Sequence, residues 1–288
     1  MKIAYLFIVY NKPLDVFNLV RLLDNGKNAF FIHFKKGVSF TVPDDIKTKV
    51  NVIFAKKRFK AGWAGFKVIE ATIHLMQLAF ESEYTFDYYI NMSGSCFPVY
   101  SNFIIEKKLK TIQHSVIEGI KIPNLSLQNE GLPKIIYPWF QDELQNCNRY
   151  LKKYFHKILH VFLKIINLKR KFPAGYDPYF GSQWWALTQE AVVEVLQSYT
   201  NNKLLYIFFK RVWASDEQYI QTVVYNSPRL EGKLINQPFR YIDWNTNGPP
   251  KTLTILDYQK ILQSDRLFAR KIDSVISDKL IHQILSNT

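Results

Sequence analysis

The stretch IAYLFIVY, residues 3–10, decides the fold of this chain. It is a near-continuous apolar run, and the turn residues Asn11, Lys12 and Pro13 end it. Such a run is typical of a strand covered on both faces, as in a parallel sheet with helices on either side. A single Lys precedes it and no small-residue cleavage site follows. We therefore interpret it as a first strand rather than a signal peptide.

Strand and helix patterns alternate after this first strand. Further strands are expected at residues 29–34 (AFFIHF), 51–55 (NVIFA) and 87–93 (DYYINMS), with helices at 14–25 and 63–81. This alternation predicts an α/β fold with a mostly parallel central sheet flanked by helices. In such sheets ligands bind beyond the carboxyl ends of the strands, so a site is expected at loops 10–13, 34–37, 56–65 and 93–98.

The second half of the chain is less regular. Residues 148–171 look helical and basic, GSQWWALT (181–188) looks like a strand, and 189–199 and 215–226 look like helices. A turn-rich passage from Pro249 precedes further helices. The sequence contains no internal repeat and no low-complexity linker, which agrees with a single domain over residues 1–288.

Composition limits the partners. The formal net charge of +14 favours polyanions, whether nucleic acid, anionic lipid or a diphosphate-bearing substrate, without selecting among them. Cys96 and Cys147 are too few for a disulfide framework and fit a reducing compartment. No apolar run approaches the roughly 18 residues that a membrane span needs. We expect a cytoplasmic protein, at most peripheral on the inner face of a membrane.

Several nucleotide and metal motifs are missing from the sequence. It has no phosphate-binding loop, GxGxxG, HExxH or paired CxxC, and no Asp-x-Asp pair of the kind that holds a divalent metal on a sugar nucleotide. Lys and Arg side chains could neutralise a leaving diphosphate instead. No metal site and no cofactor are therefore predicted.

Four short motifs carry candidate chemistry, each with an ordinary structural alternative. In ASDE (214–217), Ser215 suits a helix N-cap, and spacing alone favours capping over a carboxylate that takes a proton from a hydroxyl. Trp184 and Trp185 should point to opposite faces of a strand, so that one could be core while the other reaches a pocket, with core packing the safer default for each. Trp244 suits sugar stacking or the core. Arg270 and Lys271 suit a solvated helix face.

Eight stretches occur in one order from about residue 3 to residue 273: IAYLFIVYNKP, FFIHFKK, GWAGFKVIEAT, YYINMSGSCFPVYS, GSQWWALT, ASDEQYIQT, FRYIDW and LFARKID. Together they closely resemble the core-2/I-branching β-1,6-N-acetylglucosaminyltransferases of glycosyltransferase family 14 and the related peptide O-xylosyltransferases. The resemblance implies a GT-A-like fold, inversion at the anomeric carbon, metal independence and a UDP-sugar donor. It also implies a nucleotide-binding half, about 1–110, and an acceptor and catalytic half, 111–288.

The resemblance assigns roles to individual residues. Glu217 matches the catalytic base and Lys271 matches the lysine that contacts the donor diphosphate. The remaining assignments are Lys251 and Arg270 at the diphosphate, Val9, Tyr10, Lys35 and Trp63 at the nucleotide, and Trp244, Trp184 and Ser95 at the acceptor. Two departures stand out. Lys35 replaces an acid that helps to hold the nucleoside, and the second diphosphate-binding Arg has no clear match, so Lys251, or less favourably Arg240, would substitute.

The animal members of this family have a membrane anchor and several disulfides, which the sequence lacks, so it looks like a bacterial relative that makes surface polysaccharide or lipooligosaccharide. The expected partners are a nucleotide-sugar donor and a glycan or lipid-linked oligosaccharide acceptor, with no nucleic acid. The family favours N-acetylglucosamine and a 6-hydroxyl. The alternatives are a xylosyltransferase-like enzyme with another donor or a protein acceptor, and a non-catalytic lipid- or RNA-binding module on this scaffold.

The basic segment 148–171 leaves two interpretations open. It holds eight Lys or Arg and no acid, and apolar residues recur at helical spacing at Leu151, Phe155, Ile158, Phe162 and Ile165. This pattern is typical of an amphipathic helix that lies on an anionic membrane. It is equally typical of a helix whose apolar stripe packs on the core beside a solvated basic rim.

Overall fold

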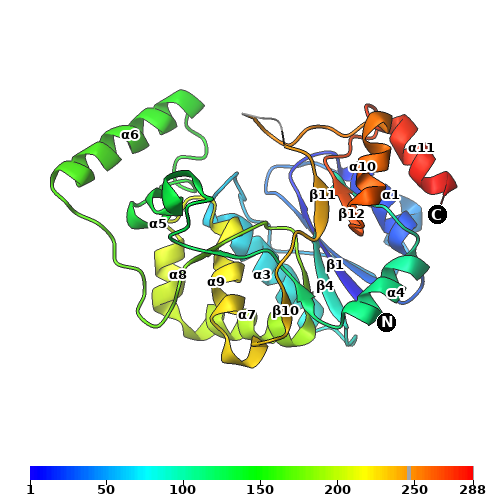
Figure 1. Cartoon of the computed structure of the whole chain (residues 1–288). Helices are drawn as coiled ribbons and strands as arrows, with labels where there is room; N and C mark the ends of the chain where they lie inside the picture. The colour runs from blue at the N-terminus through cyan, green and yellow to red at the C-terminus, as the bar shows by residue number, and fades with distance from the viewer. Residues whose placement is uncertain (245–247, 288) are drawn as a thin grey trace.

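The computed structural model describes residues 1–244 and 248–287, and its centre is a seven-stranded sheet in the order β10-β6-β9-β4-β1-β2-β3 (Figure 1). Strands β4, β1, β2 and β3 pair in parallel. The first-half strands are β1 (Ile3–Val9), β2 (Ala29–Phe34), β3 (Val52–Phe54) and β4 (Tyr88–Met92). The second half adds β6 (Ser115–Val116), β9 (Ala186–Thr188) and β10 (Leu234–Ile235). Of these, β9 runs antiparallel to β4 and β6, and β10 is parallel to β6.

Strand β1 shows why an apolar run builds this fold. All seven of its residues are buried, and alternate side chains enter two separate cores. On one face Tyr5 and Phe7 pack with α1 (Pro13–Leu23), α4 (Asn102–Ile112), α10 (Tyr258–Gln263) and α11 (Asp278–Ser286). On the other face Leu6 packs with α3 (Phe66–Phe80), α7 (Gln189–Asn201), α8 (Lys203–Phe209) and α9 (Tyr219–Tyr225). The predicted α/β fold with a mostly parallel, covered sheet is confirmed.

A second sheet of three strands brings the C-terminal part of the chain to the loop after β4. Its order is β11 (Arg240–Ile242), β12 (Phe268–Arg270) and β5 (Cys96–Pro98), with Arg270 opposite Cys96. The helix face suggested for Arg270 and Lys271 is therefore wrong. Phe268 and Ala269 are fully buried, and the strand forms because β5 and β11 supply ladder partners that are distant in sequence.

Three predicted elements of the second half are shorter than expected, and one of them is the basic helix 148–171, which ends at Ile165. The predicted helix 215–226 is a 3-10 turn, Ser215–Glu217, followed by α9, because Gln218 leaves helical geometry and its side-chain amide donates to the Trp213 carbonyl oxygen at 2.6 Å. Ser215 is not the cap: its hydroxyl is buried and has no partner. In GSQWWALT only Ala186–Thr188 is ladder-paired, and the Gly181 N–H donates to Glu217 instead.

The remaining α-helices and strands are short, except for α6. They are α2 (Asp44–Lys47), a small hairpin of β7 (Ile120–Lys121) and β8 (Tyr179–Phe180), α5 (Pro133–Ile136) and α6 (Arg149–Ile165). In Figure 1, α6 is held away from the sheet and its two helical layers. Within the described ranges, no helix has the length and apolar character that crossing a membrane requires.

Candidate active site

The carboxyl edge of the parallel strands gathers the predicted residues. Because β9 is antiparallel to β4, the segment before Ala186 lies beyond the carboxyl end of β4, where the Asn91 side-chain amide donates to the Gln183 carbonyl oxygen at 2.9 Å. The Gly181 N–H in the same segment donates to the Glu217 carbonyl oxygen at 2.8 Å. Tyr10, just after β1, lies within electrostatic range of both Asp216 and Arg270. The fold therefore joins Glu217 and Arg270 at one edge.

The turn that carries Glu217 is held by backbone contacts. Ala214 has φ 51°, in the left-handed region, and its N–H donates to the carbonyl oxygen of Ala64, which also has a positive φ. The Glu217 N–H donates back to Ala214 at 2.9 Å. Left-handed geometry costs an alanine about 1 kcal/mol, so the surrounding contacts must hold the turn. Unusual backbone of this kind is found at active sites more often than elsewhere.

The charges around Glu217 form what we name the Glu217 cluster: Glu217, Asp216, Lys134 and Glu118. Burial, reinforced by the charge of Asp216, raises the pKa of Glu217 to about 8, against an opposing attraction from Lys134. Burial also raises the pKa of Asp216 to about 6, and its Oδ1 atom has no hydrogen-bond partner. Within residues 1–244 and 248–287 the Glu217 carboxylate accepts no hydrogen bond. A desolvated carboxylate with a pKa near neutrality is suited to proton transfer.

Lys134 and Glu118 were not predicted from the sequence. The Lys134 ammonium lies 3.5 Å from the ring centroid of Phe180 and 4.8 Å from that of Trp213. Burial lowers its pKa, while attraction to Glu217 opposes the shift. Glu118 accepts the Ser182 N–H at 3.2 Å. Neither residue lies in a recognisable motif, and both meet Glu217 only through tertiary contacts.

Gly181 explains part of the GSQWW motif. A Cβ atom at this position would lie 1.9 Å from the carbonyl oxygen of Glu118. Only glycine therefore allows the two backbones to approach while the Gly181 N–H supports Glu217. This close approach is a structural requirement that a single sequence does not reveal.

A second group of side chains, which we name the Arg270 cluster, consists of Arg270, Ser93, Ser95, Trp184 and Arg240. Nη1 of Arg270 donates to the hydroxyls of Ser93 and Ser95, at 2.6 and 2.7 Å, and its guanidinium lies 4.3 Å from the Trp184 ring centroid. Arg240 is buried, donates to the Asn91 carbonyl oxygen and lies 4.9 Å from the same ring. Arg240 is therefore a core residue and does not reach a ligand at the surface.

The two lysines assigned to the diphosphate differ in their surroundings. Lys251 pairs with the buried carboxylate of Asp257 at 2.6 Å and lies 3.9 Å from Asp243. Lys271 is exposed, and in the described part of the chain its ammonium makes no ion pair. Only its carbonyl oxygen is used, by the Leu253 N–H. Lys271 can meet an added anion without giving up a protein partner, whereas Lys251 cannot.

The four predicted nucleotide residues are spread along the edge. Val9 is buried, and its carbonyl oxygen accepts the N–H of half-buried Lys35 at 2.8 Å, so its side chain is not presented to a ligand. Tyr10 is partly exposed. Trp63 is 75% exposed and packs edge-on against Trp213, beside the Glu217 cluster. Their assigned roles stay predictions; Trp63 reaches the Glu217 cluster through Trp213, whose ring centroid lies 4.8 Å from the Lys134 ammonium.

The three predicted acceptor residues differ in how exposed they are. Trp244 is 61% exposed, next to the residues outside the described ranges, and forms an isolated bridge with Pro250. Trp184 is buried on one face of the sheet and Trp185 on the other, which confirms the predicted opposite orientation. Neither ring is free to line a pocket, so the core packing that was the default for each is confirmed. Ser95 is half-buried, and its hydroxyl is held by Arg270.

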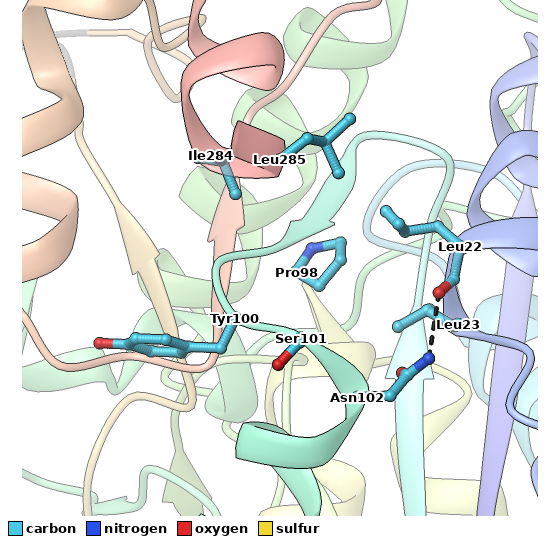
Figure 2. Close-up of a pocket in the computed structure, with 8 residues that line it drawn as sticks. All are labelled: Leu22, Leu23, Pro98, Tyr100, Ser101, Asn102, Ile284 and Leu285. Atoms are coloured by element: carbon cyan, nitrogen blue, oxygen red, sulfur yellow. Dashed lines mark hydrogen bonds between the residues drawn. The ribbon is translucent and has the colours of Figure 1, made fainter. Parts of the chain in front are cut away.

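Two cavities elsewhere in the molecule are less suitable as an active site than this edge of the sheet. Figure 2 shows a crevice of about 20 Å³ between the ends of α1, α4 and α11, where the Asn102 amide donates to the Leu22 carbonyl oxygen. It is lined by Leu, Ile, Pro and uncharged polar side chains, with no group suited to proton transfer. A shallow cavity of about 290 Å³ lies at the amino ends of β2 and β3, beside the Asp24–Lys49 ion pair. Ligands of α/β sheets bind at the opposite ends of the strands.

No group of three or more His, Cys, Asp or Glu side chains that could hold a metal ion occurs in residues 1–244 and 248–287. The cations at this edge, Arg270 and Lys271, are instead the groups available to an anionic ligand.

Comparison with known proteins gives a consistent family assignment. The model of the family described as "Branch: Core-2/I-Branching enzyme" matches residues 3–262. β-Glucuronosyltransferase GlcAT14B of Arabidopsis thaliana is 24% identical, over 77% of this chain and 50% of its own. Xylosyltransferase 2 of Rattus norvegicus is 21% identical, over 98% of this chain and 33% of its own.

A human relative carries the name probable β-1,3-galactosyl-O-glycosyl-glycoprotein β-1,6-N-acetylglucosaminyltransferase 7. It is 26% identical, over 67% of this chain and 43% of its own. The chain thus spans half or less of the length of these three relatives. Their names specify three different transferred sugars.

Proposed function

The chain belongs to the Core-2/I-branching enzyme family, and we propose that it is an inverting, metal-independent glycosyltransferase with Glu217 as its catalytic base. The observation that carries the proposal is the environment of Glu217. Its carboxylate is desolvated, has a pKa raised to about 8 and lies at the carboxyl edge of the sheet on a turn held by backbone contacts. A carboxylate with these properties is suited to general-base catalysis near neutral pH.

The proposed reaction is a single displacement. Glu217 accepts the proton of an acceptor hydroxyl as the hydroxyl oxygen attacks the anomeric carbon of the donor. The bond from that carbon to the diphosphate breaks on the opposite face, and the nucleoside diphosphate leaves with the bonding electrons. One base is sufficient, because the diphosphate needs no proton when cations hold it.

The exposed cation Lys271 is proposed to hold the leaving diphosphate. Arg270 beside it is anchored to Ser93 and Ser95 through Nη1, so its other N–H groups can donate to phosphate oxygens. Lys251 is the weaker candidate because it already neutralises Asp257. This division of labour supports charge neutralisation without a metal ion.

The donor sugar is the finer part of the proposal. The motif resemblance favours UDP-N-acetylglucosamine and a β-1,6 linkage on a glycan. Glucuronic acid and xylose, the sugars in the names of the other two relatives, are the alternatives to compare. Trp244 is an exposed ring on which an acceptor sugar can stack.

The test is a screen of these three UDP-sugars for hydrolysis and transfer, with EDTA present throughout, comparing wild type with Glu217→Gln. We expect one donor to turn over, and Glu217→Gln to bind it while losing roughly 10²- to 10⁴-fold in kcat. Glu231→Gln, an exposed acid elsewhere in the chain, is the matched control and should keep full activity. Failure of every donor to bind, or activity that disappears in EDTA, would contradict the proposal.

A further inference from the structure

Helix α6 (Arg149–Ile165) turns toward the body of the protein a face that carries His156, His160 and the buried Leu163. His156 Nε2 accepts the Phe140 N–H at 2.9 Å, and His160 Nε2 bonds the Pro138 carbonyl oxygen at 3.0 Å. The Trp139 ring centroid lies 4.8 and 4.5 Å from those of the two histidines. The helix is thus attached to segment 137–140 mainly by imidazole and aromatic contacts, and of its apolar stripe Phe155 joins them, edge-on to Phe140 at 6.0 Å between ring centroids.

The apolar face of α6 is largely exposed. Leu151, Ile158 and Ile165 are 68, 69 and 76% exposed. The same face includes Tyr154, Phe155, Val161 and Phe162, all at least 45% exposed. Of the two interpretations of this segment, a core-packed stripe is therefore excluded. In Figure 1 the helix projects from the rest of the molecule, and the Phe140 ring, which packs edge-on against Phe155, covers part of this face at one end.

Basic side chains border the apolar face. Lys153, Lys157 and Lys164 lie along one flank by helical spacing, and all three are exposed. None of them forms an ion pair within residues 1–244 and 248–287, and segment 148–171 contains no acidic residue. This edge of the protein is therefore apolar and strongly positive, with no negative charge of its own helix to offset it.

We propose that α6 is a membrane-docking helix that inserts its apolar face into an anionic lipid surface, with the flanking lysines at the headgroups. An exposed apolar face beside unpaired lysines is the arrangement that such a surface recognises. A second copy of the chain fits less well, because it would bring the same positive charges together without a compensating acid. Charge complementarity therefore favours anionic lipid.

The attachment of α6 also relates the docking face to the Glu217 cluster. Trp139, which holds both histidines, lies 6.3 Å from Trp213 between ring centroids, and Trp213 in turn contacts Lys134. Docking through α6 would thus bring Trp139 and Trp213, and the Glu217 cluster beside them, close to the lipid surface. The inference goes beyond glycosyl transfer and does not depend on it.

The experiment is sedimentation of the full chain with vesicles of phosphatidylglycerol and phosphatidylcholine at low salt. Ile158→Asp/Ile165→Asp should weaken binding at least about tenfold, because both charges would have to enter the apolar layer. Leu204→Asp/Ile207→Asp on α8 is the matched control, since these side chains are similarly exposed, at 74 and 60%. It should bind as wild type does. Circular dichroism checks that both variants fold.

Binding should also weaken with added salt and with vesicles of phosphatidylcholine alone. The proposal is overturned if wild type does not bind anionic vesicles, or if the α8 variant loses binding as fully as the α6 variant. It is also overturned if sedimentation velocity shows self-association that the α6 variant abolishes while vesicle binding is unchanged. Transfer to a soluble acceptor, measured in parallel, separates this outcome from the proposed function, since the α6 variant should keep it.

Discussion

The Glu217 cluster and the Arg270 cluster lie at the same edge of the sheet, but the charges of Glu217 and Arg270 have different surroundings. Glu217 and Asp216 are desolvated, their pKa values are raised, and one oxygen of Asp216 has no partner. Arg270, in contrast, is anchored by two hydroxyls and lies over the Trp184 ring. The desolvated carboxylates are suited to moving a proton, and the anchored guanidinium of Arg270 is suited to positioning an anion.

The largest disruption of this contrast should come from Gly181→Ala. The new Cβ would meet the Glu118 carbonyl oxygen at 1.9 Å, so the backbone that supports Glu217 must move. We expect a loss of about 3 kcal/mol in the free energy of unfolding, measured with urea, together with most of the activity. At Gly62 a Cβ would meet only side-chain atoms of Gln145, Oε1 at 3.2 Å and Cβ at 3.4 Å, and no backbone atom closer than these. If Gly62→Ala were equally destabilising, close backbone approach at Gly181 would not be the cause.

Replacing the two lysines separately should distinguish a functional cation from a structural one. Lys271→Ala should lower kcat/KM on the order of 100-fold with unchanged stability, because it removes charge at the leaving group. Lys251→Ala should instead lower the free energy of unfolding by about 1 kcal/mol, because it leaves the buried Asp257 unpaired. Steady-state kinetics and urea unfolding of both variants check this. A larger kinetic effect at Lys251 would reverse the assignment.

The pH dependence of kcat/KM should report the free carboxyl of Glu217. With a pKa of about 8, the base is mostly protonated at lower pH, so the rate should rise with pH and level off above that value. Lys134 lowers this pKa by attraction, so Lys134→Met should move the midpoint upward by roughly one pH unit. Lys210→Met, which removes a lysine over Tyr206, is the control and should leave the profile unchanged.

The smallest effect concerns stability. The pKa of Glu217 is higher in the folded state than its ordinary 4.5, so the folded protein binds the proton more tightly than the unfolded chain does. Its contribution to stability should therefore fall as pH rises from about 4.5 to about 8. Glu217→Gln should be more stable than wild type by on the order of 1 kcal/mol at about pH 8, with little difference at about pH 4.5. Thermal unfolding of wild type and Glu217→Gln at both pH values tests this. A variant that is no more stable than wild type at about pH 8 would contradict the prediction.

Much of the fold was predictable because its signals are local. The apolar runs predicted β1 through β4 within one or two residues at each end, and helical spacing predicted α1, α3 and α7. The prediction failed where a distant partner decides the conformation. The segment Phe268–Arg270 is a strand because β5 and β11 pair with it, and the helix at 215–226 is interrupted where Gln218 bonds the Trp213 carbonyl oxygen.

The candidate site divides in the same way. Glu217 and Lys271 could be named from motifs that stand in a recognisable order. Lys134 and Glu118 could not, because they belong to no motif and reach Glu217 only when α5 and the segment after β6 fold beside it. The different availability of Lys271 and Lys251 was also invisible, since it depends on the position of Asp257.

By itself the sequence determined the layered α/β architecture, the family motifs and the amphipathic character of segment 148–171, because hydrophobic periodicity and motif order are properties of neighbouring residues. Only the tertiary structure decided which carboxylate is desolvated, which cations stay unpaired and which face of α6 is largely exposed. These properties depend on burial and on charges that are distant in sequence, and both arise only when the chain folds.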